Sequence, residues 1–264
     1  MNPIADTAYY GCGIRMLDAA RRRPICNDTY AARFMDERGR EILSRFAESR
    51  SNGTNVARHR HIDDELRRRL KADPALTVVL IGCGFDSRAF RLTGGRWFEL
   101  DEPPLIAAKN AKLPVQECGN ALVRIPIEFA TETLESKLAA YADDRPALVV
   151  LEGVTMYLPS IALERTLREL RKLLPRHEVI VDLMTRDFAE QYGKQVKQTI
   201  AEIGVNFDPL TDPAGPFTRT GYRETASESI VCAGLRYQRL GFLRPLMKFA
   251  YPDVVSGYTV RTFA

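Results

Sequence analysis

The sequence lacks a long apolar run and an apolar N-terminal signal. No apolar stretch in the 264 residues approaches the roughly 20 residues that a membrane-spanning helix needs, so we expect no membrane span and no membrane partner. The first residues, MNPIADTAYYGCG, offer neither a basic start nor an apolar core of the kind that directs export. These absences favour a cytoplasmic protein.

Histidine and cysteine, the usual ligands of zinc, are also scarce. The five cysteines are widely spaced and contain no C-x-x-C pair, which indicates reduced thiols rather than a disulfide framework. Of the three histidines, His59 and His61 are two residues apart and therefore point to different faces of a helix. We expect no metal site.

Positive charge exceeds negative charge only modestly, with a formal net charge of +4 and a pI near 8.8. The clusters Arg21–Arg23 and Arg67–Arg69 fit either a nucleic-acid surface or a solvated helix face. Since no aromatic residues are interleaved with them and no RNA-reading motif accompanies them, we favour the solvated face and expect no nucleic-acid partner.

The chain is long enough to bury one substantial core, and because it has no internal repeat we expect one domain over residues 1–264. Residues 1–75 contain no clear strand and are expected to form a helical cap. The spacing of apolar residues predicts helices over Tyr30–Ala47 and Ile62–Leu70, separated by a loop at Ser51–Asn55.

Beyond residue 75, short β-branched runs alternate with helical patterns. Strands are predicted at 77–81, 96–100, 122–127, 147–151, 178–183 and 258–263. A helix with a stripe of leucines is predicted over Ile161–Leu174. This alternation is typical of a doubly wound, mostly parallel sheet, with its core in 76–185 and its last strands in 231–264.

One stretch breaks the rhythm of strands and helices. Arg186–Ser227 contains Asp208-Pro209 and Pro213-Ala214-Gly215-Pro216, which are turn signals. We expect residues 186–230 to form a helical insertion over the site, able to act as a lid.

A glycine turn follows the first strand. Gly82-x-Gly84 stands between a strand and a helix, where glycines let the backbone approach a ligand. Alone it is a weak signal, because small residues also join strands to helices without any ligand. The third glycine of the dinucleotide fingerprint is absent, and Asp101 ends the next strand about 20 residues on, where a carboxylate can hold ribose hydroxyls. Together these features favour a nucleotide-type cofactor without a bound pyrophosphate.

The segment VVLIGCGFDSRAFRL at 78–92 makes the sequence recognisable. It resembles the leucine carboxyl methyltransferase family, which includes many bacterial enzymes of polyketide and other secondary metabolism. Three more motifs extend the resemblance over roughly residues 7–185, namely ARHR at 57–60, FELDEP at 98–103 and LEGVTMYLP at 151–159. The resemblance implies a class I methyltransferase with a Rossmann-like, seven-stranded sheet, which binds S-adenosyl-L-methionine and methylates an oxygen of a small molecule.

The resemblance also implies roles at the methionine end of the cofactor. Arg58 should pair with the methionyl carboxylate, which a guanidinium can bind in bidentate fashion. Glu152 should face the methionyl amine. Tyr157 should border the acceptor pocket, and Arg15 stands where the family often has a basic residue near the methionine end or the substrate carboxylate.

At the adenosine end, Gly82 and Gly84 should line the cofactor, and Asp101 should accept the ribose hydroxyls. Glu128 stands where the family usually has an aspartate that receives the adenine amino group, and its side chain is one methylene longer. Further cofactor contacts are expected from Asp86, Glu102 and Phe129.

Simpler roles stay open for some of these residues. Arg88 and Arg91 are expected to brace neighbouring carboxylates rather than touch a ligand. Asp86 can act as the cap of the glycine turn, and Tyr157 can be a core residue with a satisfied hydroxyl.

Methyl transfer from a sulfonium is an in-line displacement, so catalysis depends largely on the positions of the two reactants. A carboxylate acceptor is ionised at neutral pH and needs no base, whereas a phenol with a pKa of about 10 is helped by one. Because no histidine is placed by a motif to be that base, we favour a carboxylate, which yields a methyl ester, over a polyketide phenol.

Two other classes stay open. An NAD-dependent oxidoreductase would share the sheet, and a non-catalytic protein would share the cofactor site. The acceptor and the oligomeric state have no signature in the sequence.

Overall fold

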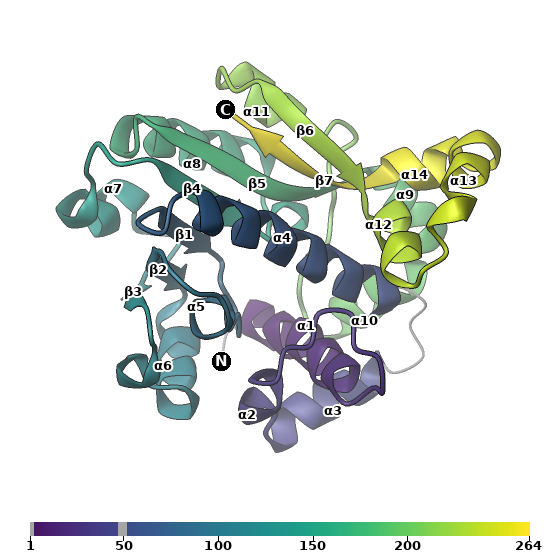
Figure 1. Ribbon diagram of the computed structural model, residues 1–264, viewed down its shortest axis with the longest axis horizontal. Coiled ribbons are helices and arrows are strands. Elements are labelled where there is room, and N and C mark those ends of the chain that lie inside the picture. The colour runs from purple at the N-terminus through teal and green to yellow at the C-terminus, as the bar shows by residue number, and fades with distance from the viewer. Residues whose placement is uncertain (1–2, 47–51) are drawn as a thin grey trace.

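A seven-stranded sheet runs through the computed structural model, which describes residues 3–46 and 52–264 (Figure 1). The strands are β1 (Thr77–Ile81), β2 (Arg96–Asp101), β3 (Ala121–Pro126), β4 (Ala147–Leu151), β5 (His177–Met184), β6 (Glu224–Ser229) and β7 (Tyr258–Phe263). They lie in the order β3-β2-β1-β4-β5-β7-β6. β1 to β5 pair in parallel, and β7 is antiparallel to both of its neighbours. This is the expected Rossmann-like arrangement.

Helices connect and cover the strands. The α-helices are α1 (Pro3–Ala19), α2 (Ala31–Phe34), α3 (Glu37–Arg45), α4 (Asn52–Ala72), α5 (Arg88–Arg91), α6 (Pro103–Lys112), α7 (Leu134–Leu138), α8 (Ser160–Leu173), α9 (Arg186–Tyr192), α10 (Lys194–Glu202), α11 (Gly215–Arg219), α12 (Ile230–Tyr237), α13 (Arg244–Ala250) and α14 (Pro252–Gly257). Short 3₁₀ turns are η1 (Val115–Glu117), η2 (Ala139–Tyr141), η3 (Thr155–Tyr157) and η4 (Gly241–Leu243).

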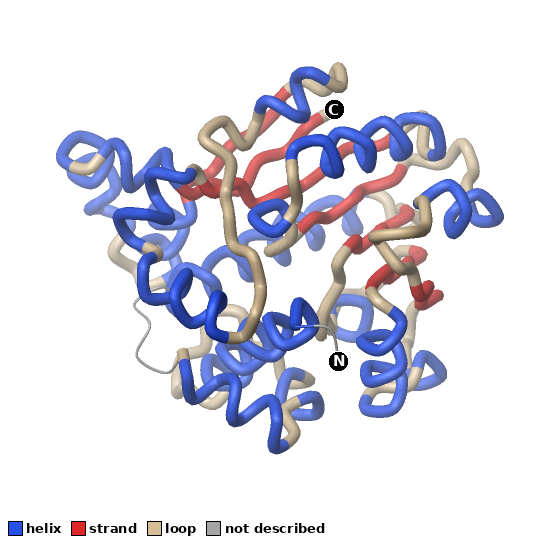
Figure 2. Tube along the Cα trace, turned by 180° about the vertical axis from the view of Figure 1, so that it is seen from behind, coloured by secondary structure: helices blue, strands red, loops and turns tan. Residues whose placement is uncertain are grey.

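The central strand β1 is buried on both faces, because all five of its residues are inaccessible. Val78 belongs to the same buried cluster as Ile62 of α4, and Figure 1 shows α4 crossing that face of the sheet. Val79 belongs to the cluster that contains Leu163 of α8, and Figure 2 shows helices over that opposite face. Wholly apolar β1 therefore anchors a sheet between two helical layers.

A third buried cluster joins the N-terminal helices to the region after β5. It contains Phe34 of α2 and Phe85, which follows β1, together with Ile200 of α10 and Phe207. The entry to α3 is stabilised by Asp36, whose carboxylate accepts a hydrogen bond of 2.9 Å from the N–H of Gly39. The N-terminal helices and α10 thus share one apolar core.

Each strand expected from the sequence is confirmed to within a residue or so, but several other expectations were wrong. The helix expected over Tyr30–Ala47 is divided into α2 and α3, and residues 231–264, expected to hold the last strands, form mostly helices before the single strand β7. β6 lies in the stretch expected to be helical. Its sequence, ETASES, is polar and mostly exposed, because β6 is an edge strand that pairs with β7 alone. The loop expected at Ser51–Asn55 is also wrong from residue 52 on, since Asn52 begins α4. Ala47 and Ser51 lie outside the described residues.

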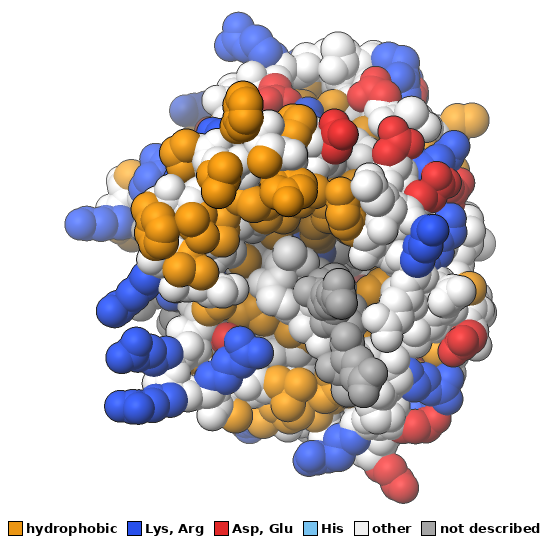
Figure 3. All heavy atoms as spheres, turned by 90° about the vertical axis from the view of Figure 1, so that its right-hand side faces the viewer, with side chains coloured by type: hydrophobic (Ala, Val, Ile, Leu, Met, Phe, Trp, Pro, Cys, Tyr) orange, Lys and Arg blue, Asp and Glu red, His pale blue; other side chains and the backbone are white. Residues whose placement is uncertain are grey.

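Apolar side chains gather on the face formed around α12, α13 and α14 (Figure 3). The exposed large apolar residues of this region are Leu240, Phe242, Leu246, Phe249 and Tyr251. In the described part of the chain, no helix is long and apolar enough to cross a membrane.

Candidate functional site

A cavity of about 560 Å³ opens at the carboxyl ends of the parallel strands. Its walls come from the segments after β1, β2 and β4, from α1 and α4, and from α9 and α10. Ligands of open α/β sheets bind at this edge, next to the two neighbouring strands between which the strand order changes direction. Here these strands are β1 and β4. The volume lies within the range of ordinary ligand sites.

The turn after β1 requires glycine at two positions. Gly82 and Gly84 have φ angles of 66° and 48°, in the left-handed region. A Cβ atom on Gly82 would lie only 2.6 Å from Cγ2 of Val154, and both glycines line the cavity. A close-packed backbone turn therefore forms this wall.

Asp101 at the end of β2 is tied to that turn. One oxygen of its carboxylate accepts a hydrogen bond of 2.7 Å from the N–H of Gly84, and the other accepts one of 2.8 Å from the N–H of Glu102. Burial raises the pKa of Asp101 to about 6, although the two backbone N–H groups oppose that rise. A poised, hydrogen-bonding carboxylate thus faces the cavity.

A continuous chain of buried ion pairs crosses the polar end of the cavity. From one end of this series of ion pairs to the other, its members are Arg15, Asp28, Arg91, Asp63, Arg88, Glu152, Arg58 and Asp182. The links range from 2.6 Å for Arg88 to Asp63 up to 3.4 Å for Arg91 to Asp28. Because Asp86 also pairs with Arg88, four guanidinium groups face five carboxylates.

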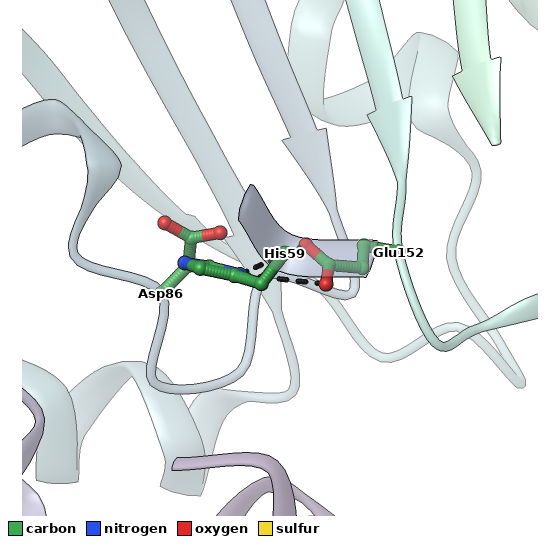
Figure 4. Close-up of side chains that lie close together, drawn as sticks. All are labelled: His59, Asp86 and Glu152. Atoms are coloured by element: carbon green, nitrogen blue, oxygen red, sulfur yellow. Dashed lines mark hydrogen bonds and ion pairs between the residues drawn. The ribbon is translucent and has the colours of Figure 1, made fainter. Parts of the chain in front are cut away.

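Arg88 lies at the centre of this chain and is fully buried. It contacts His59 from α4, Asp86 from the loop after β1 and Glu152 from the end of β4. Figure 4 shows these three side chains close to one another. One potential ligand atom from each of these three lies within 4.8 Å of the others, which is a spacing that a metal ion could use. The Arg88 guanidinium, 2.7 Å from Glu152, already supplies the cation that these groups surround. The three side chains therefore bind the guanidinium group of Arg88 where a metal cation could otherwise lie.

His59 is held in its neutral form. Burial, followed by the charge of Arg88, lowers its pKa. Nε2 lies 2.8 Å from a guanidinium nitrogen of Arg91, and Nδ1 lies 2.8 Å from a guanidinium nitrogen of Arg88 and 3.2 Å from Glu152. Both ring nitrogens are thus engaged inside the protein.

Glu152 stays ionised in this environment. Burial alone would raise its pKa, but Arg88, His59 and Arg58 outweigh burial and hold that pKa well below its usual range. Its carboxylate is therefore a fixed negative charge at the cavity wall.

Arg58 is oriented by two residues that the sequence analysis did not identify. Its Nη1 donates to Asp182 over 2.9 Å and also to the hydroxyl of Tyr258, which in turn donates to Asp182 over 2.9 Å. The other oxygen of Asp182 accepts from the N–H of Gly153 over 2.6 Å. The one available signal was Asp182 itself, an acid within the apolar strand VIVDLM, since a buried charge without a partner is costly.

Another part of the cavity wall, here called the apolar end, carries no charge. It is lined by Met156, Leu158, Phe188, Val196, Ile200 and Phe207. The ring of Tyr157 meets that of Phe207 edge to face, with centroids 5.8 Å apart. Burial raises the pKa of Tyr157 further above its ordinary value, so its hydroxyl stays protonated. This end offers shape and apolar surface rather than charge.

Ten of the eleven residues expected at the site line this cavity. They are Arg15, Arg58, Gly82, Gly84, Asp86, Asp101, Glu102, Phe129, Glu152 and Tyr157. Glu128 lies outside it: its side chain is exposed, and its carboxylate accepts a hydrogen bond of 3.0 Å from the hydroxyl of Thr131. The neighbouring backbone N–H of Phe129 donates to Glu102 over 3.3 Å, so Glu102 lies beside the segment that carries Glu128.

The simpler roles weighed from the sequence are also visible. Arg88 and Arg91 brace carboxylates, as expected. Asp86 caps the turn by accepting from the N–H of Arg88 over 2.7 Å. Arg15 lines the cavity but is committed on one side, because its Nε donates to Asp28 over 2.9 Å and its Nη2 donates to the carbonyl of Phe85 over 2.7 Å.

Comparison with known proteins shows which family the chain resembles. The model of the family described as leucine carboxyl methyltransferase matches residues 10–171. The tetracenomycin polyketide synthesis O-methyltransferase TcmP of Streptomyces glaucescens is 30% identical over 211 residues, which cover 76% of this chain and 74% of that protein. A Frankia alni protein named as an S-adenosyl-L-methionine-dependent methyltransferase is 27% identical over 277 residues, with coverage of 96% and 92%.

Among solved structures, one from Thermobifida fusca that is named as a methyltransferase superposes with a TM-score of 0.60. It covers 89% of this chain and 92% of its own, at 11% sequence identity, and so supports the fold alone.

Proposed function

The chain belongs to the leucine carboxyl methyltransferase family and uses S-adenosyl-L-methionine as methyl donor, and on this premise we propose that it methylates a carboxylate oxygen of a small, largely apolar acceptor. Secondary metabolism is the proposed setting, in keeping with the name of the Streptomyces relative. The reaction would form a methyl ester.

The polar end of the cavity fits the charge of this cofactor. S-adenosyl-L-methionine carries a sulfonium and an ammonium group against one carboxylate, and therefore has a net positive charge. The ion-pair chain has one carboxylate more than it has guanidinium groups, and His59 within it is neutral. A surplus of negative charge at a buried wall favours a cationic ligand.

The residues of this wall have distinct proposed roles. Arg58 would hold the cofactor carboxylate, while Asp182 and Tyr258 keep its guanidinium in place. Glu152 would orient the amine, and Asp101 would accept the ribose hydroxyls. Gly82 and Gly84 would let the backbone approach the adenosine. When bound, the cofactor supplies an electrophilic methyl group.

The choice of a carboxylate acceptor follows from the acid–base groups of the cavity. None of the residues lining its described part is a histidine, and the lining carboxylates Asp86 and Glu152 are ion-paired, with pKa values held low mainly by Arg88 against the effect of burial. Asp101, whose pKa burial raises to about 6, is proposed to hold the ribose hydroxyls and is therefore not free to act as a base on the acceptor. A phenol would be helped by a base with a pKa near the working pH, whereas an ionised carboxylate attacks the methyl carbon without one. This shortage of a free base is the observation that carries the proposal.

The apolar end would then bind the body of the acceptor. Phe188, Val196, Ile200 and Phe207 offer an apolar wall, and burial of an apolar body there contributes roughly 25 cal/mol for each Å² removed from water. Arg15, at the polar end, and Tyr157, at the apolar end, are proposed to orient the acceptor carboxylate.

A pair of surrogate acceptors tests the proposal. Naphthoic acid and naphthol share one apolar ring system and differ in the oxygen that would be methylated. We expect methyl naphthoate, identified by mass spectrometry and by its hydrolysis in mild base. The two reactions also differ in protons, since the carboxylate releases none at neutral pH and the phenol releases one.

Calorimetric titration with S-adenosylhomocysteine serves as the control for an intact cofactor site. A base-stable methyl ether from naphthol, without ester from naphthoic acid, would contradict the carboxylate proposal and select the phenol instead. An enzyme that binds S-adenosylhomocysteine but modifies neither would restrict the acceptor to one with a shape unlike this pair.

A further inference from the structure

An apolar, basic surface lies beside the cavity and takes no part in the proposed chemistry. Of the eight large apolar residues that are notably exposed in the described chain, five come from the twelve residues 240–251. They include Phe249, with 88% of its surface exposed, Phe242 with 75% and Leu246 with 60%. Monomeric proteins rarely leave apolar side chains this exposed in one contiguous patch without a partner.

Three of these side chains form a stripe. Phe242, Leu246 and Phe249 are spaced i, i+4 and i+7, which places them on one side of η4 and α13. Figure 3 shows the resulting apolar area, with Lys and Arg side chains along one part of its edge and Asp and Glu side chains along another. The arrangement is that of a protruding apolar ridge with a partly basic margin.

The charge of this region is mainly positive. Residues 236–251 contain Arg236, Arg239, Arg244 and Lys248 and no acidic residue, and one exposed acid, Asp253, follows in α14. Arg244 pairs with Glu228 over 2.9 Å, whereas within the described chain Arg239 and Lys248 have no ion-pair partner and are exposed. Whatever covers the stripe must therefore accept apolar side chains and carry negative charge at its edge.

A second copy of this chain does not meet that requirement. In a symmetric dimer the same patch would face itself, and Arg239 and Lys248 would lie close to the same cations of the other copy. A bilayer with anionic headgroups meets both halves of the requirement, because basic side chains near its surface and apolar side chains inserted at the level of the acyl chains are each favourable.

We propose that Phe242, Leu246, Phe249, Arg239 and Lys248 dock this enzyme on the surface of an anionic lipid bilayer. No membrane-spanning helix is needed, and the sequence argument against a membrane partner concerned spanning segments alone. The neighbouring helices α12 and α14 supply Val231 and Val254 to the cavity wall. If the proposed function holds, docking brings the apolar end of the cavity close to acceptors dissolved in the bilayer.

Vesicle sedimentation tests the docking without any knowledge of the acceptor. Sucrose-loaded vesicles of phosphatidylcholine, with or without phosphatidylserine, are pelleted with the protein. We expect binding to the phosphatidylserine vesicles, and a loss of about tenfold or more for the double variant Phe242→Ser/Phe249→Ser. Arg239→Glu/Lys248→Glu should weaken binding about tenfold, and added salt should mimic this variant.

Ile161→Ser is the matched control, because Ile161 is 82% exposed but lies at the start of α8, away from the patch (Figure 1). It should bind vesicles as wild type does. S-adenosylhomocysteine binding by each variant shows that the fold is intact and tests the cofactor site separately.

Three results would overturn the proposal. The first is failure of the wild-type protein to sediment with phosphatidylserine vesicles, and the second is equal sedimentation of wild type and the double Ser variant. The third is a dimer in light scattering that Phe242→Ser/Phe249→Ser converts to a monomer, since the patch would then be an interface between copies.

Discussion

The two ends of the cavity are lined by different kinds of side chain, which are charged at one end and apolar at the other. At the polar end, buried guanidinium and carboxylate groups from α1, α4, the loop after β1, β4 and β5 hold one another at salt-bridge distance. At the apolar end, α9, α10 and the segment up to Phe207 contribute side chains that fill space without charge. The polar end is over-determined, because each charge is fixed by several partners. The apolar end can exchange one side chain for another of similar size at a small cost.

The sharpest way to break the polar end is to remove its central cation. Arg88→Met leaves Asp63, Asp86 and Glu152 buried around an apolar side chain, and breaking a buried pair typically costs about 3–5 kcal/mol. We expect a loss of that size in the free energy of unfolding, measured by urea denaturation.

Arg68→Ala is the matched control, because Arg68 pairs with Glu65 on the surface and is 62% exposed. It should change the free energy of unfolding by less than about 1 kcal/mol. Equal effects of the two substitutions would show that the buried chain has no special energetic weight.

A second test asks which part of the cofactor the polar end recognises. Arg58→Ala should weaken S-adenosylhomocysteine binding about 100-fold, equivalent to about 2.7 kcal/mol, because a charge-paired carboxylate loses its partner. Binding of methylthioadenosine, which lacks the amino acid part, should change little.

Asp182→Asn should reproduce the Arg58→Ala pattern in weaker form, since Asp182 acts by holding the Arg58 side chain. A similar loss for both ligands in calorimetry would instead indicate general damage to the site.

The third test uses pH. The raised pKa of Asp101, about 6, means that the ionised form able to accept hydroxyl hydrogen bonds is gained as pH rises through 6. S-adenosylhomocysteine affinity should therefore increase about tenfold between pH 5 and pH 7, with weaker affinity and a flat profile in Asp101→Asn.

The effect of pH on folding stability through Asp101 has the opposite sign to its effect on affinity. Because the fold favours the neutral form of Asp101, its contribution to stability is fully present at low pH and is lost as pH rises through about 6. A pH profile of affinity that is unchanged in Asp101→Asn would assign the titration to another group.

The smallest effect is expected at the apolar end. Phe207→Leu keeps an apolar side chain but removes the edge-to-face contact with Tyr157, which is worth about 0.5–1.5 kcal/mol. We expect the KM for the acceptor to rise a few-fold, with no change in S-adenosylhomocysteine affinity. A change in cofactor affinity alone would place Phe207 at the wrong end of the cavity.

Local signals were enough for much of the polar end. The glycines at 82 and 84 follow the apolar run VVLI and the acid at 101 ends the next strand, so their place at the carboxyl edge of the sheet could be predicted. Arg58 and Glu152 were identified by resemblance, and the structure places both at the cavity.

Asp182 and Tyr258 could not be found in this way. They act through contacts with Arg58 that span 124 and 200 residues of the chain. Glu128 is a second example of what local sequence could not predict. Its position in the motif did not predict that its side chain would point to Thr131 and to solvent.

The sequence by itself determined the parallel core, the cofactor turn and the family. Each of these depends on residues that are close in the chain and on the apolar pattern of single strands and helices. The edge strand β6, the partners of Arg58 and the position of the stripe Phe242, Leu246 and Phe249 next to helices of the cavity wall were decided by tertiary structure. Their physical cause is non-local: an edge strand needs only one neighbour, and a buried charge is stabilised by whichever opposite charge the fold brings to it.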